Sequence, residues 1–267
     1  MQTPLETPVR ELMSKPAIMV APTDSLAEAY QRLLDAGISS LAVVEGGALV
    51  GVVSRTDLLR AGRRSGATMG HSGDARHVIL EFPKNSVGEI MTRDVCTVTG
   101  DASIASASKS MSENHVHRAF VQDGTSLLGV FSTLDVIRAL KDQPAKEPIS
   151  EFMSAPITVV DVEQTIATAV DKLEASRVTG LIVVENEWPV GVFTQVEALA
   201  ARELAEGTLV EEAMDPALIC MPVSTRIHRA AQQALRMRVR RIVASENRHM
   251  RGILSGLDFA KYAARGA

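Results

Sequence analysis

The heptapeptide GVVSRTD at residues 51–57 recurs as GVFSTLD at 129–135, GVFTQVE at 191–197 and GILSGLD at 252–258. Each copy begins 38 residues after a methionine that ends a short amphipathic stretch: VRELM, VGEIM, ISEFM or VEEAM. A constant spacing without gaps indicates a fourfold internal repeat. The methionines are Met13, Met91, Met153 and Met214, and the repeats span 9–61, 87–140, 149–204 and 210–262.

Within each repeat the hydrophobic period changes in a fixed order. The first repeat shows a β-like run (AIMVA), a helical run after Ser25, two strands (LAVVE and LVGVVS) across Gly46-Gly47, and a helix from Arg55. This β-α-β-β-α order predicts a mixed α/β (α+β) fold. Repeats of about 50 residues bury too little alone, so we expect two pseudo-symmetric pairs. The predicted N-caps of the first helices are Ser25, Ser103, Thr165 and Thr225.

The rest of the chain is short. We predict a first pair at 9–140, with a flexible connector at 62–86 that holds one ordered run at Val78–Phe82, and a second pair at 149–262. Residues 141–148 are predicted to form a polar, proline-containing hinge. No segment is long enough for a separate catalytic domain.

The repeated heptapeptide resembles the G-h-h-S/T-x-x-D/N signature of the cystathionine-β-synthase (CBS) domain family, here in four copies of a stand-alone protein. The resemblance implies that two repeats associate through their sheets and bind an adenosyl ligand such as AMP, ADP, ATP, NAD or S-adenosylmethionine in their cleft. It also implies that such modules regulate a partner, as in the nucleotide-sensing subunit of the AMP-activated kinase.

The heptapeptide itself suits a nucleotide. Its hydroxyl can cap a helix and donate to a phosphate, and the acid one turn later can accept ribose hydroxyls. The alternative is that Ser/Thr-x-x-Asp/Glu is only a capping box. The longer Glu197 departs from the pattern, so we expect at most three competent sites. The residues predicted to bind the ribose are Asp57, Asp135 and Asp258. The hydroxyls predicted to donate hydrogen bonds to phosphate are those of Ser54, Ser132, Thr194 and Ser255.

The two residues before the second strand separate the repeats into two classes. They are His117-Arg118 and Arg240-Arg241 in the second and fourth repeats, but Ser39-Ser40 and Thr179-Gly180 in the others. Arginine suits phosphate in a partly desolvated cleft, so these basic pairs are predicted to hold phosphate and to disfavour the cationic S-adenosylmethionine. The alternative is that they are solvated strand ends.

Charge is unevenly distributed in a chain of net charge −4. Residues 145–215 hold 14 acids and 4 bases, whereas 216–267 hold 10 bases and 2 acids. A basic block can bind nucleic acid, but its acidic neighbour favours intramolecular complementarity together with ligand phosphate. Aromatic residues make up only 3% of the chain, which disfavours a stacking platform for single strands.

These features favour a non-catalytic cytoplasmic sensor that binds AMP, ADP, ATP or NAD and signals to an unidentified protein. No nucleophile, metalloprotease or P-loop motif is present. We expect no membrane insertion, because no apolar run reaches about 18 residues, and no metal, because His115 and His117 lack companion ligands. A homodimer is expected from the resemblance alone. The competing hypothesis is an assembly scaffold with degenerate ligand sites.

Overall fold

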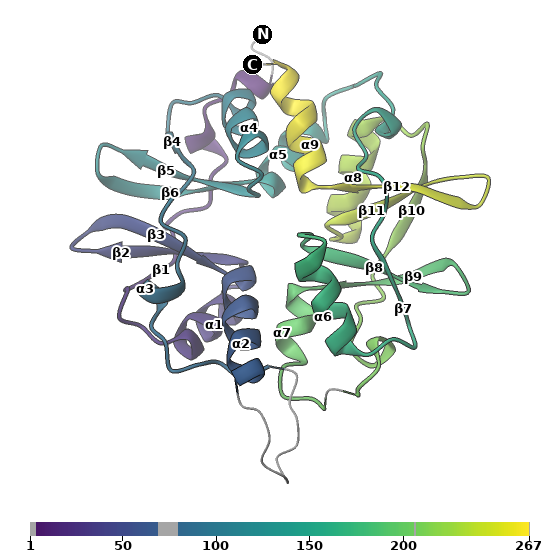
Figure 1. Ribbon diagram of the computed structural model, residues 1–267. Helices are drawn as coiled ribbons and strands as arrows, with labels where there is room; N and C mark the ends of the chain where they lie inside the picture. The colour runs from purple at the N-terminus through teal and green to yellow at the C-terminus, as the bar shows by residue number, and fades with distance from the viewer. Residues whose placement is uncertain (1–3, 69–79, 206, 267) are drawn as a thin grey trace. The chain divides into compact units, whose positions relative to one another are not determined.

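The computed structural model describes residues 4–68, 80–205 and 207–266 (Figure 1). Each repeat forms a three-stranded sheet whose first two strands are parallel and whose last two are antiparallel. The predicted β-α-β-β-α order is therefore confirmed in all four repeats. The first repeat comprises β1 (Met19–Val20), α1 (Leu26–Asp35), β2 (Ser40–Glu45), β3 (Ala48–Ser54) and α2 (Arg55–Thr68). The second comprises β4 (Thr97–Thr99), α4 (Ile104–Glu113), β5 (Arg118–Asp123), β6 (Ser126–Ser132) and α5 (Thr133–Leu140).

The other two repeats follow the same plan. The third comprises β7 (Val159–Asp161), α6 (Ile166–Ala175), β8 (Gly180–Glu185), β9 (Trp188–Thr194) and α7 (Gln195–Ala200). The fourth comprises β10 (Ile219–Pro222), α8 (Ile227–Met237), β11 (Arg241–Glu246), β12 (His249–Ser255) and α9 (Gly256–Ala263). A short helical turn opens each repeat: η2 (Val9–Glu11), α3 (Val87–Ile90), η3 (Ile149–Glu151) and η4 (Val210–Glu212). Two further turns are η1 (Pro4–Glu6) and η5 (Ala264–Gly266). No helix in the described ranges is long and apolar enough to cross a membrane.

Three of the four predicted N-caps are confirmed. The side chains of Ser25, Ser103 and Thr165 each accept a hydrogen bond from the backbone N–H three residues later. The prediction of Thr225 was wrong, because α8 has Arg226 at its N-cap and no side-chain capping bond. The apolar face of α8 begins at Ile227, and the cap position therefore falls on the arginine.

The chain divides into two compact units that each contain alternate repeats. Unit 1 comprises Met1–Ala17, Asp94–Ile157 and Leu218–Ala267, and unit 2 comprises Ile18–Arg93 and Thr158–Ala217. In unit 1, α4 and α5 pack against α9 (Figure 1), and in unit 2, α2 packs against α7. Each unit has its own buried apolar cluster. The association of consecutive repeats through their sheets, within 9–140 and 149–262, stays a prediction.

The opening stretches are exchanged between consecutive repeats. Ser14, at the end of the first opening stretch, exchanges two backbone hydrogen bonds of 2.9 Å with Val130 of the second repeat. The preceding methionine covers the first glycine of the heptapeptide, and a Cβ at any of the four glycines would lie within 3.0 Å of a methionine sulfur. These glycines therefore admit a neighbouring segment, not a ligand. The pairs are Met13–Gly129, Met91–Gly51, Met153–Gly252 and Met214–Gly191.

Part of the predicted connector is helical, because α2 continues to Thr68. Of the predicted ordered run, Val78 lies outside the described residues. Leu80 is buried, and Phe82 meets the Tyr30 ring edge-on at 5.5 Å. The Leu80 N–H donates to the carbonyl of Arg202 at 3.0 Å. This end of the connector therefore belongs to the core of unit 2.

The predicted hinge is attached to α8. The Gln232 amide donates to the carbonyl of Lys141 at 2.7 Å, and the Ala145 N–H donates to Nδ1 of His228 at 3.1 Å. Ala145 is buried. The segment 141–148 is polar, but it is not independent of the fold, because its backbone groups form hydrogen bonds with side chains of α8.

Candidate functional site

All four heptapeptides form capping boxes at the start of a helix. The backbone N–H and the hydroxyl of the Ser or Thr both donate to one oxygen of the acid three residues later, at 2.5–2.9 Å. Glu197 makes this pair of bonds as well as the aspartates do, so its extra methylene does not break the cap. The capping interpretation is confirmed at every copy. It leaves one carboxylate oxygen of each acid for another partner.

That second oxygen is occupied in unit 1. Oδ1 of Asp258 accepts from the Ser154 hydroxyl at 2.8 Å and from Lys261 at 3.0 Å. Oδ1 of Asp135 accepts from Arg138 at 2.7 Å. Asp135 and Asp258 are 1% and 0% exposed. A ribose at either acid would have to share or displace these donors.

The acids of unit 2 differ. Asp57 and Glu197 are half-buried, and no ion pair to either acid occurs among the described residues. Burial raises the pKa of Asp57 against the lowering effects of its hydrogen bonds with Ser54 and of the charge of Arg60, three residues later. Asp57 is thus a desolvated carboxylate with an oxygen that can accept hydroxyls without losing an ion pair.

The basic pairs of the second and fourth repeats come together in unit 1. His117 and Arg118 lie at the start of β5, and Arg240 and Arg241 at the start of β11. Burial, together with Arg118, Arg241 and Arg240, lowers the pKa of His117 to about 4, while Asp258 opposes them. Because charges act on a pKa at short range, these five side chains form one cluster, which we call the basic cluster.

The starts of α5 and α9 bring the basic cluster close to two capping boxes. A Cβ at Gly256 would clash with the Thr133 side chain, so the first turns of these helices are in contact. Ser132 and Ser255, which precede the two helices, therefore lie in the same unit as the basic cluster. Of the predicted site residues, four lie in unit 2 instead: Ser54, Asp57, Thr194 and Glu197. The positions that match the basic pairs hold Ser39, Ser40, Thr179 and Gly180 there.

The sequence analysis missed three residues that contact the candidate acids. Arg138 and Lys261 stand three residues after Asp135 and Asp258, a spacing that brings side chains together on a helix and could have identified them. Ser154 could not be found in this way. It reaches Asp258 only because the opening stretches are exchanged between repeats.

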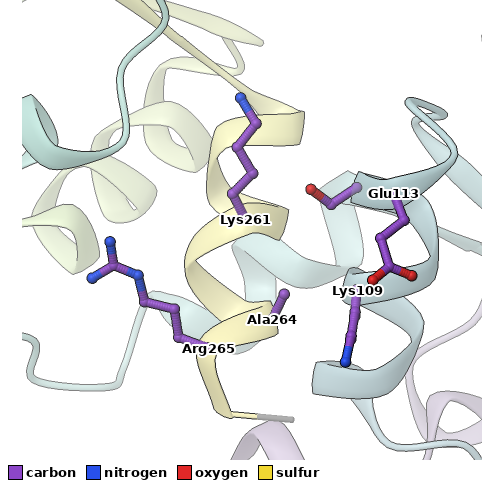
Figure 2. Close-up of a pocket in the computed structure, with 6 residues that line it drawn as sticks. Lys109, Glu113, Lys261, Ala264 and Arg265 are labelled. Carbon is purple, nitrogen blue, oxygen red and sulfur yellow. The ribbon is translucent and has the colours of Figure 1, made fainter.

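A surface hollow of about 290 Å³ lies between α4 and α9. Two of its three basic residues are engaged elsewhere, since Lys261 pairs with Asp258 and Arg265 with Glu151. Figure 2 shows both side chains extending away from Lys109 and Glu113 on the facing helix. The hollow is therefore lined by aliphatic stems and does not gather positive charge. Its lining residues are Lys109, Ser112, Glu113, Lys261, Ala264 and Arg265.

The chemistry available at the basic cluster is anion binding. Guanidinium groups bind phosphoryl oxygens in a planar, bidentate geometry, and a nearby histidine can be protonated when an anion binds. In the described part of the chain, no three His, Cys, Asp or Glu side chains gather in a way that could hold a metal ion.

Comparisons with known proteins agree with this architecture. A family model described as the CBS domain matches residues 9–64, 87–142 and 149–203. The crystal structure of MJ1225 from Methanocaldococcus jannaschii, described as a candidate archaeal homolog of g-AMPK, is similar with a TM-score of 0.81 at 21% identity, over 96% of this chain and 99% of that one. An uncharacterized conserved protein from Pyrococcus horikoshii has a TM-score of 0.66 at 19% identity, over 96% of this chain and 100% of that one.

Among curated sequences, the uncharacterized protein MJ1404 of Methanocaldococcus jannaschii is 24% identical over 221 residues. The match covers 76% of this chain and 49% of that protein, so the chain spans about half the length of this relative. At these identities the structural likenesses establish the fold.

Proposed function

Because the chain belongs to the CBS domain family, we propose that it is a non-catalytic regulatory protein that binds an adenine nucleotide, AMP, ADP, ATP or NAD, with the phosphates on the basic cluster of unit 1. The proposal includes residues 210–262 as a fourth CBS repeat. Its support is the element order β10-α8-β11-β12-α9, which repeats that of the three matched segments. The proposed protein acts in the cytoplasm by binding a partner protein.

One observation carries the proposal. Burial and three arginines hold His117 neutral, and the arginines make the potential around it positive, which Asp258 offsets in part. A phosphate group would lower that potential, whereas the sulfonium of S-adenosylmethionine would raise it. The basic cluster therefore favours phosphorylated adenosyl ligands.

We place the ribose on the aspartates of the capping boxes. Asp57 can accept hydroxyls on its second oxygen directly, but it belongs to unit 2 and would serve a site separate from the basic cluster. Asp258 can do so only if Ser154 or Lys261 moves, and Asp135 only if Arg138 moves. Ligand binding at Asp258 would thus loosen the opening stretch of the third repeat, which offers a route from ligand to conformation.

Thermal unfolding tests the proposal with AMP, ADP, ATP, NAD and S-adenosylmethionine. A nucleotide at 100 times its Kd stabilises a folded protein by about 2.7 kcal/mol. We expect this shift in the wild type and its loss in Arg240→Gln/Arg241→Gln. The matched control, Arg248→Gln/Arg251→Gln, removes the same charge from the β11–β12 hairpin of the same unit and should keep the shift. An unchanged shift in the first variant would refute the phosphate site.

A scaffold without a ligand is the second candidate, and the saturation of Asp258 favours it. Four donors already satisfy this buried carboxylate: the Ser255 N–H and hydroxyl, Ser154 and Lys261. A purely structural role accounts for them all. If no nucleotide shifts the wild-type melting temperature, the scaffold replaces the sensor.

A further inference from the structure

The exposed face of α8 differs in charge from that of its three counterparts. α1, α4 and α6 each carry both acidic and basic residues, as in Glu28, Arg32 and Asp35 on α1. α8 contains no acidic residue, and Arg226, Arg229 and Arg236 are exposed along it. Arg229 and Arg236 lie on the side of the helix opposite the buried Ile227 and Ala234, and Arg226 lies at the N-cap. We call these three arginines the arginine stripe.

The arginine stripe is unfavourable for the helix that carries it. Arg226 replaces the Ser or Thr cap of the other three helices, and the loss of such a cap destabilises a helix. Cations near a helix N-terminus oppose the macrodipole, and Arg226 and Arg229 repel each other one turn apart. Stability alone would select against Arg226 and Arg229, whereas Arg236, in the last turn, suits the macrodipole.

No acid of the described part of the chain neutralises the stripe. None of its three arginines takes part in an ion pair there. The predicted complementarity between the basic and acidic blocks does not extend to α8, since Arg265 with Glu151 is the ion pair that joins these blocks among the described residues. At the end of α8 stands Met237, which at 56% exposed is the most exposed large apolar side chain described.

We propose that the arginine stripe, with Met237 at its end, is the docking surface for an acidic segment of the partner protein. From Arg226 to Arg236 the stripe is about 15 Å long, the length of a single short segment. Guanidinium groups pair well with carboxylates, and Met237 can accept an apolar side chain beside them. A nucleic acid is a poorer occupant, because the side chain exposed at the end of the stripe is the aliphatic Met237 and not an aromatic ring on which a base could stack.

This inference rests on the proposed function only in assuming a partner. The stripe and the basic cluster involve different residues, so the two proposals fail separately. A variant that loses the nucleotide-induced shift in melting temperature should still bind the peptide. A variant that loses peptide binding should still show that shift.

The test is fluorescence anisotropy of a labelled polyglutamate peptide of about ten residues, which matches the stripe in length. We expect saturable binding that weakens with salt and becomes about tenfold weaker in Arg226→Gln/Arg229→Gln/Arg236→Gln. The matched control is Lys109→Gln/Lys141→Gln/Arg248→Gln, which removes three exposed cations of unit 1 outside α8 and should bind as the wild type does. The variant Arg240→Gln/Arg241→Gln should also bind normally.

Four results would overturn the proposal. The first is no binding, and the second is equal weakening in the stripe variant and its control. The third is tighter binding of an oligothymidylate of equal charge, which would assign the stripe to nucleic acid. The fourth is a wild-type mass by light scattering that doubles with concentration and stays monomeric in the stripe variant, which would make a second copy of this chain the occupant.

Discussion

Units 1 and 2 are built from the same elements, yet they differ in charge. Unit 1 holds 17 basic and 12 acidic residues, whereas unit 2 holds 11 basic and 20 acidic ones. The capping boxes have the same hydrogen bonds in both units, so they serve the fold whatever the charge around them. What differs is the second oxygen of the acids: in unit 1 it forms an ion pair with Arg138 or Lys261, whereas the described residues of unit 2 form no such ion pair with Asp57 or Glu197. The comparison separates the residues that make the fold from those that suit a ligand.

The largest expected difference between the units is at the capping acids. Asp258→Ala removes a cap and leaves buried donors of Ser255 and Ser154 without an acceptor, so we expect a loss of about 3 kcal/mol in the free energy of unfolding. Glu197→Ala in unit 2 should cost about 1 kcal/mol, because Thr194 still caps the Val196 N–H. Urea unfolding measures both, and equal losses would contradict the distinction.

The next difference concerns the glycines under the methionines. A Cβ at Gly129 would lie 2.5 Å from the Ser14 carbonyl oxygen, which is backbone, whereas at Gly51 the nearest atom is the flexible Met91 sulfur. We expect Gly129→Ala to cost about 2–3 kcal/mol and Gly51→Ala about 1 kcal/mol. Thermal unfolding should rank them in this order, and the reverse order would refute the account of the exchanged stretches.

Acidification should affect the two units in opposite directions. His117 in unit 1 has a folded-state pKa of about 4 against 6.5 unfolded, so the unfolded state binds more protons and stability falls as pH drops from 6.5 to 4. Asp57 in unit 2 has a raised pKa, so its protonation in the folded state adds stability as pH falls through that value toward 3.8.

Urea titrations at several pH values measure these effects. His117→Gln should remove about 1–2 kcal/mol of the destabilisation between pH 6.5 and 4, after allowance for solvent screening. Asp57→Asn should reduce the gain in the free energy of unfolding that is expected as the pH falls toward 3.8. Unfolding of unit 2 can be followed separately by the fluorescence of Trp188, the single tryptophan of the chain. An unchanged pH profile in His117→Gln would contradict the assigned pKa.

The smallest difference is at the ends of the opening stretches. Ser154→Ala removes the hydrogen bond to Asp258 and should cost about 1 kcal/mol. In Ser14→Ala, which alters the same position of the first repeat, little change is expected, since Ser14 bonds Val130 through its backbone and the Asp135 oxygen accepts from Arg138 instead. Calorimetric melting of the two variants measures the difference. Equal costs would show that Ser154 has no special role.

The sequence predicted the repeats, the element order and the capping boxes well, because these depend on local periodicity and on residues three positions apart. It placed the cap of α8 on Thr225, one residue early. The helix begins where its buried apolar face begins, at Ile227, and this outweighs the preference for threonine at the cap. It could not locate Ser154 beside Asp258 or the gathering of His117 with Arg240. Both depend on packing between repeats that lie far apart in the chain.

The exchange of opening stretches also has a consequence during synthesis. Met91 follows Gly51 in the chain, so it can dock as soon as it leaves the ribosome. Met13 must wait for Gly129, which is 116 residues later. At about 5–20 residues per second this delay is roughly 6–23 s. The first opening stretch therefore stays uncovered until the second repeat has been made, and the third waits almost as long, since Met153 precedes Gly252 by 99 residues.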